Sequence, residues 1–380
     1  MKPCVLVLGA RVLRTTLKSD ELITALPRGA YTTARTFGRV AVFDLAAHLS
    51  RLANSATLMQ SASRIADPGS PELAITPELI APPLRSGIAS AIRALLAGGT
   101  RTSDGSSDIA DPTHNIGELK LTCVLFWGAA IPAARAAFAD LLCREPGAAE
   151  ADAGGGATEH DAETSDVLVL VHAASLAARH SPPIRVLALA THRSNAEAKD
   201  SGWVLARRGL EATLAARGLE EAILTAPAAP SAGEASGGLA ALEGSQTNFF
   251  VVRRSDGAVQ TADAGILHGT VRGAVLEACA RLGVPIVFEP PVLREGLAGA
   301  WRAAFLTSTS RLVLPIDELL VPVVLAQGAG GAAGTDETEL CISLPSAADA
   351  TVCLLSRAVL EYVRERSEPV LDVAALSVPT

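Results

Sequence analysis

Apolar residues recur along the chain in two patterns, as short runs typical of strands and as longer stretches with helical periodicity. The helical stretches, with apolar positions every three or four residues, cover residues 45–59, 201–217, 269–282 and 347–365. The strand-like runs are bounded by turn residues and cover residues 31–36, 40–43, 119–127, 167–172, 185–190, 222–225, 247–253, 285–289 and 304–307. Gly38 separates the first two runs and predicts a hairpin. The mixture predicts an α+β fold.

The length of the chain predicts two domains, because 380 residues exceed the size at which single cores usually stop growing. Ser181-Pro182-Pro183 has the composition of a linker. We therefore predict a small N-terminal α/β domain, residues 1–177, and a larger C-terminal cofactor-binding domain, residues 178–380. Stretches rich in Gly, Ala, Ser, Asp and Pro predict surface insertions, whose role stays open, at residues 66–77, 98–112, 145–163, 226–238 and 328–338.

Composition excludes several classes of protein. With 49% hydrophobic and 19% charged residues, the chain can bury a large core. A net charge of −8 argues against nucleic acid as a partner. No apolar run approaches the length needed to span a bilayer, so we expect no membrane partner. The basic start has too short an apolar part for a secretory signal, so we expect a cytoplasmic protein and leave organelle targeting open.

The six cysteines form no CxxC pair and the seven histidines form no HExxH motif, so we predict no metal site.

Lysine is scarce in this chain. Of the 32 basic residues, only Lys2, Lys18, Lys120 and Lys199 are lysines. A guanidinium does not deprotonate in proteins, so arginine cannot replace lysine where chemistry needs a neutral amine.

Four segments carry further candidate chemistry. In chain order they read GAYTTAR (29–35) with HLSRLANSA (48–56), then EAKDSGW (197–203), then EGSQTNFF (243–250) with GILHGTVR (265–272), and last FLTSTSRLVLPI (305–316). Taken in this order, the segments resemble the class IV, or fold-type IV, pyridoxal-phosphate (PLP) enzymes. These include branched-chain aminotransferases, D-amino-acid aminotransferases and aminodeoxychorismate lyases. The resemblance covers about residues 29–316.

The resemblance implies a fold and a set of roles. It implies the two-domain α+β fold of fold-type IV, like D-amino-acid aminotransferase, with PLP in the cleft between the domains. Lys199 stands where the family has its Schiff-base lysine, and Glu243 where a carboxylate pairs with the pyridine nitrogen. The implied phosphate-binding residues are Arg51, Thr270, Val271 and Thr309, and those beside the substrate are Tyr31 and Ser308.

The chemistry of these residues agrees with the implied roles. PLP needs a lysine amine that can lose its proton and an anion that keeps the ring nitrogen protonated. A phosphate dianion is stabilised at a helix N-terminus, and Gly269 precedes a predicted helix. Arg51 adds a charge-assisted contact. We interpret His48 as a structural residue.

Two positions depart from the family pattern. Thr32 stands where the family commonly has glutamate, and Val204 where branched-chain enzymes usually have tyrosine. The resemblance implies a homodimeric transaminase acting on an amino acid and a 2-keto acid. A PLP-dependent lyase and a PLP-binding relative without turnover remain alternatives, because a fold does not guarantee a function. The substrate's side chain and chirality stay open.

Overall fold

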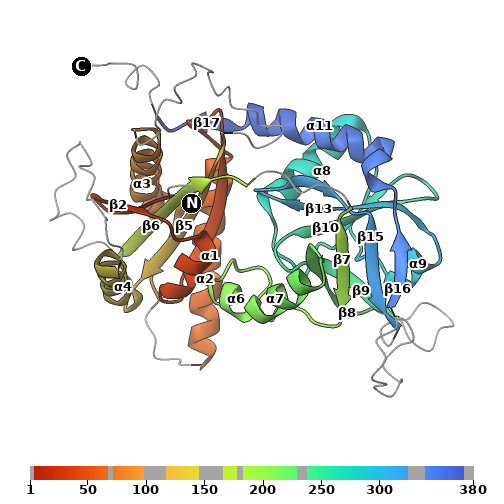
Figure 1. Ribbon diagram of the computed structural model, residues 1–380, viewed down its shortest axis with the longest axis horizontal. Helices are drawn as coiled ribbons and strands as arrows, with labels where there is room; N and C mark the ends of the chain where they lie inside the picture. The colour runs from red at the N-terminus through yellow and green to blue at the C-terminus, as the bar shows by residue number, and fades with distance from the viewer. Residues whose placement is uncertain are drawn as a thin grey trace. The chain divides into compact units, whose positions relative to one another are not determined.

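The chain divides into two compact units in a computed structural model that describes residues 4–66, 72–97, 117–144, 166–177, 183–228, 238–323 and 339–371 (Figure 1). The first unit combines Met1–Ala178, Ala198–Ala206 and Val363–Thr380, and the second combines Arg179–Glu197 and Arg207–Tyr362. The assignment of domains to residues 1–177 and 178–380 stays a prediction. The insertions predicted at 98–112, 145–163 and 328–338 lie outside the described residues, as do Ser181 and Pro182 and the middle of the other two insertions.

The first unit is built on a seven-stranded sheet in the order β17-β4-β3-β5-β6-β1-β2. All neighbouring strands are antiparallel. The predicted hairpin is confirmed, because Thr36 of β3 pairs with Val42 of β4 and Gly38 takes the left-handed φ of 62° that the turn needs. The strands are β1 (Cys4–Leu8), β2 (Arg11–Thr15), β3 (Ala30–Phe37), β4 (Ala41–Phe43), β5 (Leu119–Trp127), β6 (Val167–Ser175) and β17 (Ser367–Pro369).

Helices cover both faces of this sheet. They are α1 (Ser19–Ala25), α2 (Leu45–Ala66), α3 (Pro77–Ala97), α4 (Ala130–Arg144) and the short α6 (Gly202–Ala206). The cores on the two faces show that α2 and α3 cover one face and that α1 and α4 cover the other. Successive residues of a strand point to opposite faces. Tyr31 therefore belongs to the α1/α4 side, and its neighbours Ala30 and Thr32 point to the α2/α3 side.

Helix α3 was not predicted, because Pro82 and Pro83 lie inside it. By length and composition alone it meets the requirements for a membrane span, so the expectation that no segment approaches that length was wrong. Its apolar face is nevertheless in the core, where Leu84 and Ile88 are fully buried. Gly87 lies so close to β6 that a Cβ there would stand 2.8 Å from Val171 Cγ2. Within the first unit, α3 is a core helix.

The second unit contains a ten-stranded mixed sheet. Eight strands follow the order β12-β11-β10-β9-β8-β7-β15-β16, and β13 pairs with β10 and β14. Neighbours are antiparallel except β7 with β8, β7 with β15 and β11 with β12. The strands are β7 (Arg185–Leu189), β8 (Glu221–Pro227), β9 (Leu239–Gly244), β10 (Asn248–Arg253), β11 (Val259–Gln260), β12 (Ile286–Val287), β13 (Trp301–Ser308), β14 (Leu312–Pro315), β15 (Glu318–Pro322) and β16 (Glu339–Ser343).

The helices of this unit lie close to those expected. They are α7 (Arg208–Ala216), α8 (Thr270–Leu282), α9 (Leu293–Leu297) and α11 (Ala350–Glu365), whose last turn belongs to the first unit. The single helix predicted at 201–217 is instead two, because α6 ends before Arg207 and α7 begins after it. In the sheet, Asn248 pairs with both Glu243 and Thr307, which brings the ends of β9, β10 and β13 together.

Candidate functional site

Lys199 lies in a short segment fastened to β3 and α2 within the first unit. Its carbonyl accepts a hydrogen bond from Tyr31 N at 2.9 Å, and its own N–H donates to Ser55 Oγ at 3.0 Å. The next residues are held in the same way, because Ser201 N donates to Gly29 O at 3.0 Å and Gly29 N donates to Ser201 Oγ at 2.9 Å. The backbone of Lys199 is thus fixed on both sides.

The Lys199 side chain is half-buried. Its Nζ lies 4.6 Å from the centroid of the Tyr31 ring, within the range of a cation–π contact. Tyr31 itself is buried, at 6% exposure, in the core on the α1/α4 side. Val204 is buried in the same core, so the position where branched-chain enzymes usually carry tyrosine is a packing position in this chain. The structure therefore brings Lys199 and Tyr31 together.

Arg51 lies on α2, beside Thr32 of β3 and one helical turn from His48. Its Nη2 donates to Thr32 Oγ1 and, at 2.7 Å, to His48 Nδ1. A guanidinium only donates, so His48 Nδ1 must be an unprotonated acceptor, and the ring proton stays on Nε2. Thr32 Oγ1 also lies 2.8 Å from Nδ1. The imidazole is therefore neutral and orients Arg51, as the structural interpretation of His48 requires.

Burial dominates the electrostatics of this cluster. His48 is fully buried, and this burial, followed by the nearby charges of Arg51 and Lys199, holds its pKa well below the usual value. Burial also lowers the pKa of Arg51 to about 10, which leaves it a cation at neutral pH. Its hydrogen bonds to Thr32 and His48 are to uncharged groups, while Tyr31 and the nearby acid Asp44 act against the lowering of its pKa. With threonine in place of glutamate at position 32, the hydrogen-bond partner on β3 carries no charge.

Glu243 lies near the end of β9 in the second unit and is 4% exposed. Its Oε1 accepts from Arg193 Nε at 2.9 Å, and its Oε2 accepts from Leu267 N at 3.0 Å. Arg193 is buried too and also donates to Ala196 O. Donors of this kind, one of them a cation, favour the ionised form of a buried carboxylate. Sequence reasoning did not find Arg193.

The residues preceding α8 connect Glu243 to the start of that helix. Leu267 donates its N–H to Glu243, and its carbonyl accepts from Asn248 Nδ2 at 2.7 Å. Gly269 packs against Asn248 so closely that a Cβ would stand 2.4 Å from Asn248 Oδ1. Helix α8 then begins at Thr270 and Val271, as predicted, and the N–H groups of its first turn have no partner within the helix.

Two buried hydroxyl groups of this unit have no hydrogen-bond partner among the described residues. They are Thr270 Oγ1 at the start of α8 and Thr307 Oγ1 on β13. An oxygen-rich anion at the N-terminus of α8 fits this arrangement, because it accepts from both a hydroxyl and backbone N–H groups. Sequence reasoning named Thr270 but missed Thr307, whose burial follows from the pairing of β13 with β10.

Thr309 lies in the loop between β13 and β14, half-buried, with Ser308 before it. Ser308 Oγ accepts from Arg311 N at 3.2 Å. The loop closes at Leu312, which takes a left-handed φ of 53° although it is not a glycine. The predicted site residues therefore form two groups, Lys199, Tyr31 and Arg51 in the first unit and Glu243, Thr270, Val271, Ser308 and Thr309 in the second.

Comparison with known proteins gives one family match. Residues 148–319 match the family described as amino-transferase class IV. The matched span includes Lys199, Glu243, Thr270 and Thr309, and it lies after Tyr31 and Arg51. The sequence matches no curated protein.

Three solved structures share the fold. A branched-chain aminotransferase from the archaeon Thermoproteus uzoniensis, solved with norvaline, is 18% identical over 97% of this chain and 100% of its own, with a TM-score of 0.56. A fold IV transaminase from Curtobacterium pusillum is 20% identical over 94% and 99%, with a TM-score of 0.53. A hypothetical aminotransferase from Mycobacterium tuberculosis, with α-ketoglutarate and PMP bound, is 16% identical over 94% and 99%, with a TM-score of 0.54. The predicted α+β fold of fold-type IV is thereby confirmed.

Proposed function

We propose that this chain, whose residues 148–319 match the class IV aminotransferase family, is a PLP-dependent transaminase in which Lys199 carries the cofactor. The reaction moves an amino group between an amino acid and a 2-keto acid. The observation that carries this proposal is the position of Lys199 within the class IV match, with its backbone fixed on both sides and its amine over the Tyr31 ring.

When bound, the cofactor supplies an aldehyde for covalent attachment and a protonated ring that withdraws electrons from the substrate. Lys199 would hold the cofactor through its amine and, as general base, would take the proton from the substrate's Cα. Glu243 would hold the proton on the ring nitrogen, which favours the negative charge that develops at Cα. Arg193 supports this role by keeping Glu243 ionised.

The phosphate group has candidate partners in each unit. In the second unit, we assign it to the N–H groups of Thr270 and Val271 and to the hydroxyls of Thr270 and Thr309. The unpartnered hydroxyl of Thr307 joins this set. From the first unit, Arg51 contributes a cation whose hydrogen bonds go to the uncharged groups Thr32 and His48. Tyr31 and Ser308 are assigned to the substrate side.

An absorbance spectrum of the protein loaded with PLP tests the role of Lys199. Wild type is expected to show the visible band of lysine-bound PLP at roughly 400–430 nm, and Lys199→Ala is expected to lose it. Lys120→Ala is the matched control, because Lys120 is a half-buried lysine of the first unit outside the proposed site. A band that survives in Lys199→Ala and disappears in Lys120→Ala would refute the assignment.

Reaction type is tested by spectral conversion of the loaded enzyme to the pyridoxamine form across L- and D-amino acids, followed by its return with 2-keto acids. Norvaline and α-ketoglutarate, which are bound in the two similar enzymes, are the first pair to try. Conversion and return establish transamination and its chirality. Turnover of aminodeoxychorismate without conversion identifies a lyase, and PLP binding without reaction identifies a binding protein.

The assembly and the location of the protein are separate proposals. We propose a homodimer in the cytoplasm. Sedimentation velocity of the holoenzyme tests the dimer, because a monomer at micromolar concentration contradicts it.

A further inference from the structure

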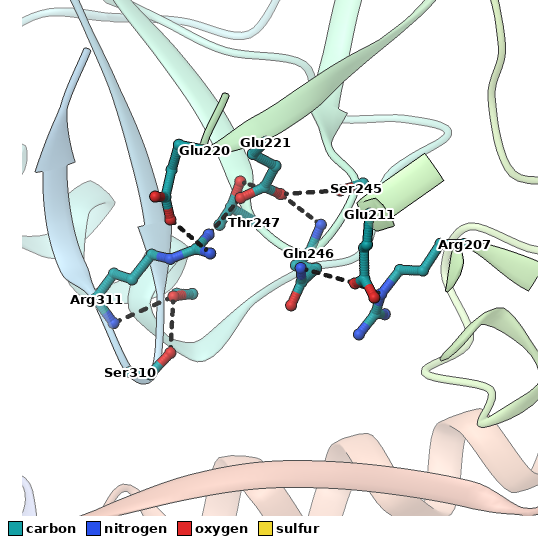
Figure 2. A network of polar contacts seen from close by, with 10 residues as sticks. Arg207, Glu211, Glu220, Glu221, Ser245, Gln246, Thr247, Ser310 and Arg311 are labelled. Carbon is teal, nitrogen blue, oxygen red and sulfur yellow. Dashed lines mark hydrogen bonds and ion pairs between the residues drawn. The ribbon is translucent and has the colours of Figure 1, made fainter. Parts of the chain in front are cut away.

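The fully buried carboxylate of Glu221, at the start of β8, accepts hydrogen bonds from the turn that follows Glu243. Its Oε1 accepts from Gln246 N at 2.5 Å and from Thr247 Oγ1 at 3.0 Å, and Ser245 Oγ lies at 3.5 Å. Three consecutive residues, 245–247, thus surround one oxygen atom (Figure 2). The turn is also closed on itself, because Gly244 N donates to Thr247 O at 2.9 Å.

The packing around this carboxylate leaves no spare room. An added Cβ at Gly244 would stand 2.0 Å from Thr247 Oγ1 and 2.5 Å from Glu221 Oε1. Ser245 N donates to Ala222 O at 2.9 Å, which ties the turn to β8 through the backbone as well. The turn that begins directly after Glu243 is therefore held in one position by β8.

The second oxygen of Glu221 is bound by Arg311, which lies in the loop between β13 and β14. Arg311 Nη1 donates to Glu221 Oε2, and its Nη2 lies 2.9 Å from Glu220 Oε1. Arg311 is the last residue of the three-residue loop that begins at Thr309, and its N–H donates to Ser308 Oγ. Figure 2 shows the guanidinium between the two carboxylates. The Arg311 side chain is only 15% exposed, so its contacts with Glu220 and Glu221 are shielded from water.

Glu221 therefore connects two segments that the proposed function assigns to opposite ends of one cofactor. The 244–247 turn continues from Glu243, the partner of the ring nitrogen, and the 309–311 loop holds Thr309, a partner of the phosphate. We propose that Glu221 and Arg311 are a pair of positioning residues that fix the distance between these two segments, so that ring and phosphate are bound together. This inference rests on the proposed function.

A positioning role predicts a specific change in the preference for PLP over pyridoxal. Pyridoxal lacks the phosphate and uses only the ring end of the site, whereas PLP uses both ends at once. Loosening the 309–311 loop therefore weakens PLP more than pyridoxal. A loss of overall stability lowers the folded fraction and therefore weakens the apparent affinity for both ligands by the same factor. The ratio of the two affinities thus separates positioning from stability.

The experiment measures dissociation constants of the full-length protein for PLP and pyridoxal, in wild type and in Glu221→Gln, Arg311→Met and the double variant. The preference for PLP is expected to fall on the order of tenfold in each single variant and little further in the double variant, as for residues that act through one link. Asp349→Asn is the control, because it breaks the Arg302–Asp349 ion pair of the same unit and is expected to leave the preference unchanged.

Circular dichroism and a thermal midpoint above the assay temperature verify that each variant is folded. If Glu221→Gln does not fold, Arg311→Lys takes its place, because an ammonium retains the charge but not the fork between two carboxylates. A preference for PLP as strong as that of wild type in folded Glu221→Gln or Arg311→Lys overturns this inference. Failure of wild type to bind PLP at all overturns the proposed function instead.

Discussion

Arg193 Nε lies 2.9 Å from Glu243 Oε1, and both side chains are less than one-tenth exposed. Removing one partner of a buried ion pair leaves the other charge poorly solvated. Arg193→Met is therefore expected to lower the free energy of unfolding of the apoprotein by about 3 kcal/mol. Urea unfolding measures this loss.

Arg185→Met is the control for that prediction, since the Arg185–Glu318 pair of the same unit is more than one-third exposed on both sides. Exposed pairs contribute about 1 kcal/mol or less. Equal losses in the two variants would show that the burial of the Arg193–Glu243 pair has no energetic consequence.

Arg51→Met is expected to weaken PLP binding roughly 10–100-fold, because it removes charge-assisted hydrogen bonds to the phosphate. Binding of pyridoxal, which has no phosphate, is expected to be unchanged. Fluorescence titration of the apoprotein with both ligands measures the difference. Arg85→Met provides the comparison, because Arg85 is an exposed arginine of the same unit that pairs with Glu368. Equal weakening of both ligands by Arg51→Met would remove Arg51 from the phosphate site.

Gly244→Ala is expected to destabilise the protein by about 2–3 kcal/mol, because the new methyl group overlaps Thr247 Oγ1 and Glu221 Oε1. Gly273→Ala on α8 is expected to do the opposite. Gly273 is exposed, has no atom within 4 Å of an added Cβ, and lies inside a helix where alanine is favoured by about 1 kcal/mol. Thermal unfolding of the two variants gives shifts of opposite sign if this description of the turn is correct.

His172 makes stability depend on pH. Burial lowers its pKa from the usual 6.5 to about 4, while its Nε2 donates to Leu17 O at 3.0 Å. The unfolded chain therefore takes up a proton near pH 6.5 and the folded chain only near pH 4. The free energy of unfolding therefore falls by up to about 3 kcal/mol as the pH is lowered through this window.

The variant His172→Gln isolates that contribution, because its amide can still donate to Leu17 O but does not titrate. Urea unfolding at pH 7 and pH 4.5 is expected to show a smaller loss of stability in the variant than in wild type. A pH dependence as steep as that of wild type would assign the effect to other groups.

The sequence by itself determined the elements and motifs that are local. The strands at 119–127 and the hairpin at Gly38 follow from apolar runs and a turn residue. The resemblance to class IV aminotransferases followed from short contiguous motifs, among them the one around Lys199, and residues 148–319 match that family. Helix α3 escaped prediction because Pro82 and Pro83 are local signals against a helix, and packing on β6 outweighs them.

Only the tertiary structure decided which polar side chains meet. Arg193 pairs with Glu243 across 50 residues and Arg311 with Glu221 across 90, and no periodic pattern connects such positions. The order of the strands brings each pair together, and strand order is set by the packing of the whole sheet. Thr32 and His48 show the same limit, since a strand and a helix must be packed together before a hydroxyl and an imidazole can orient Arg51.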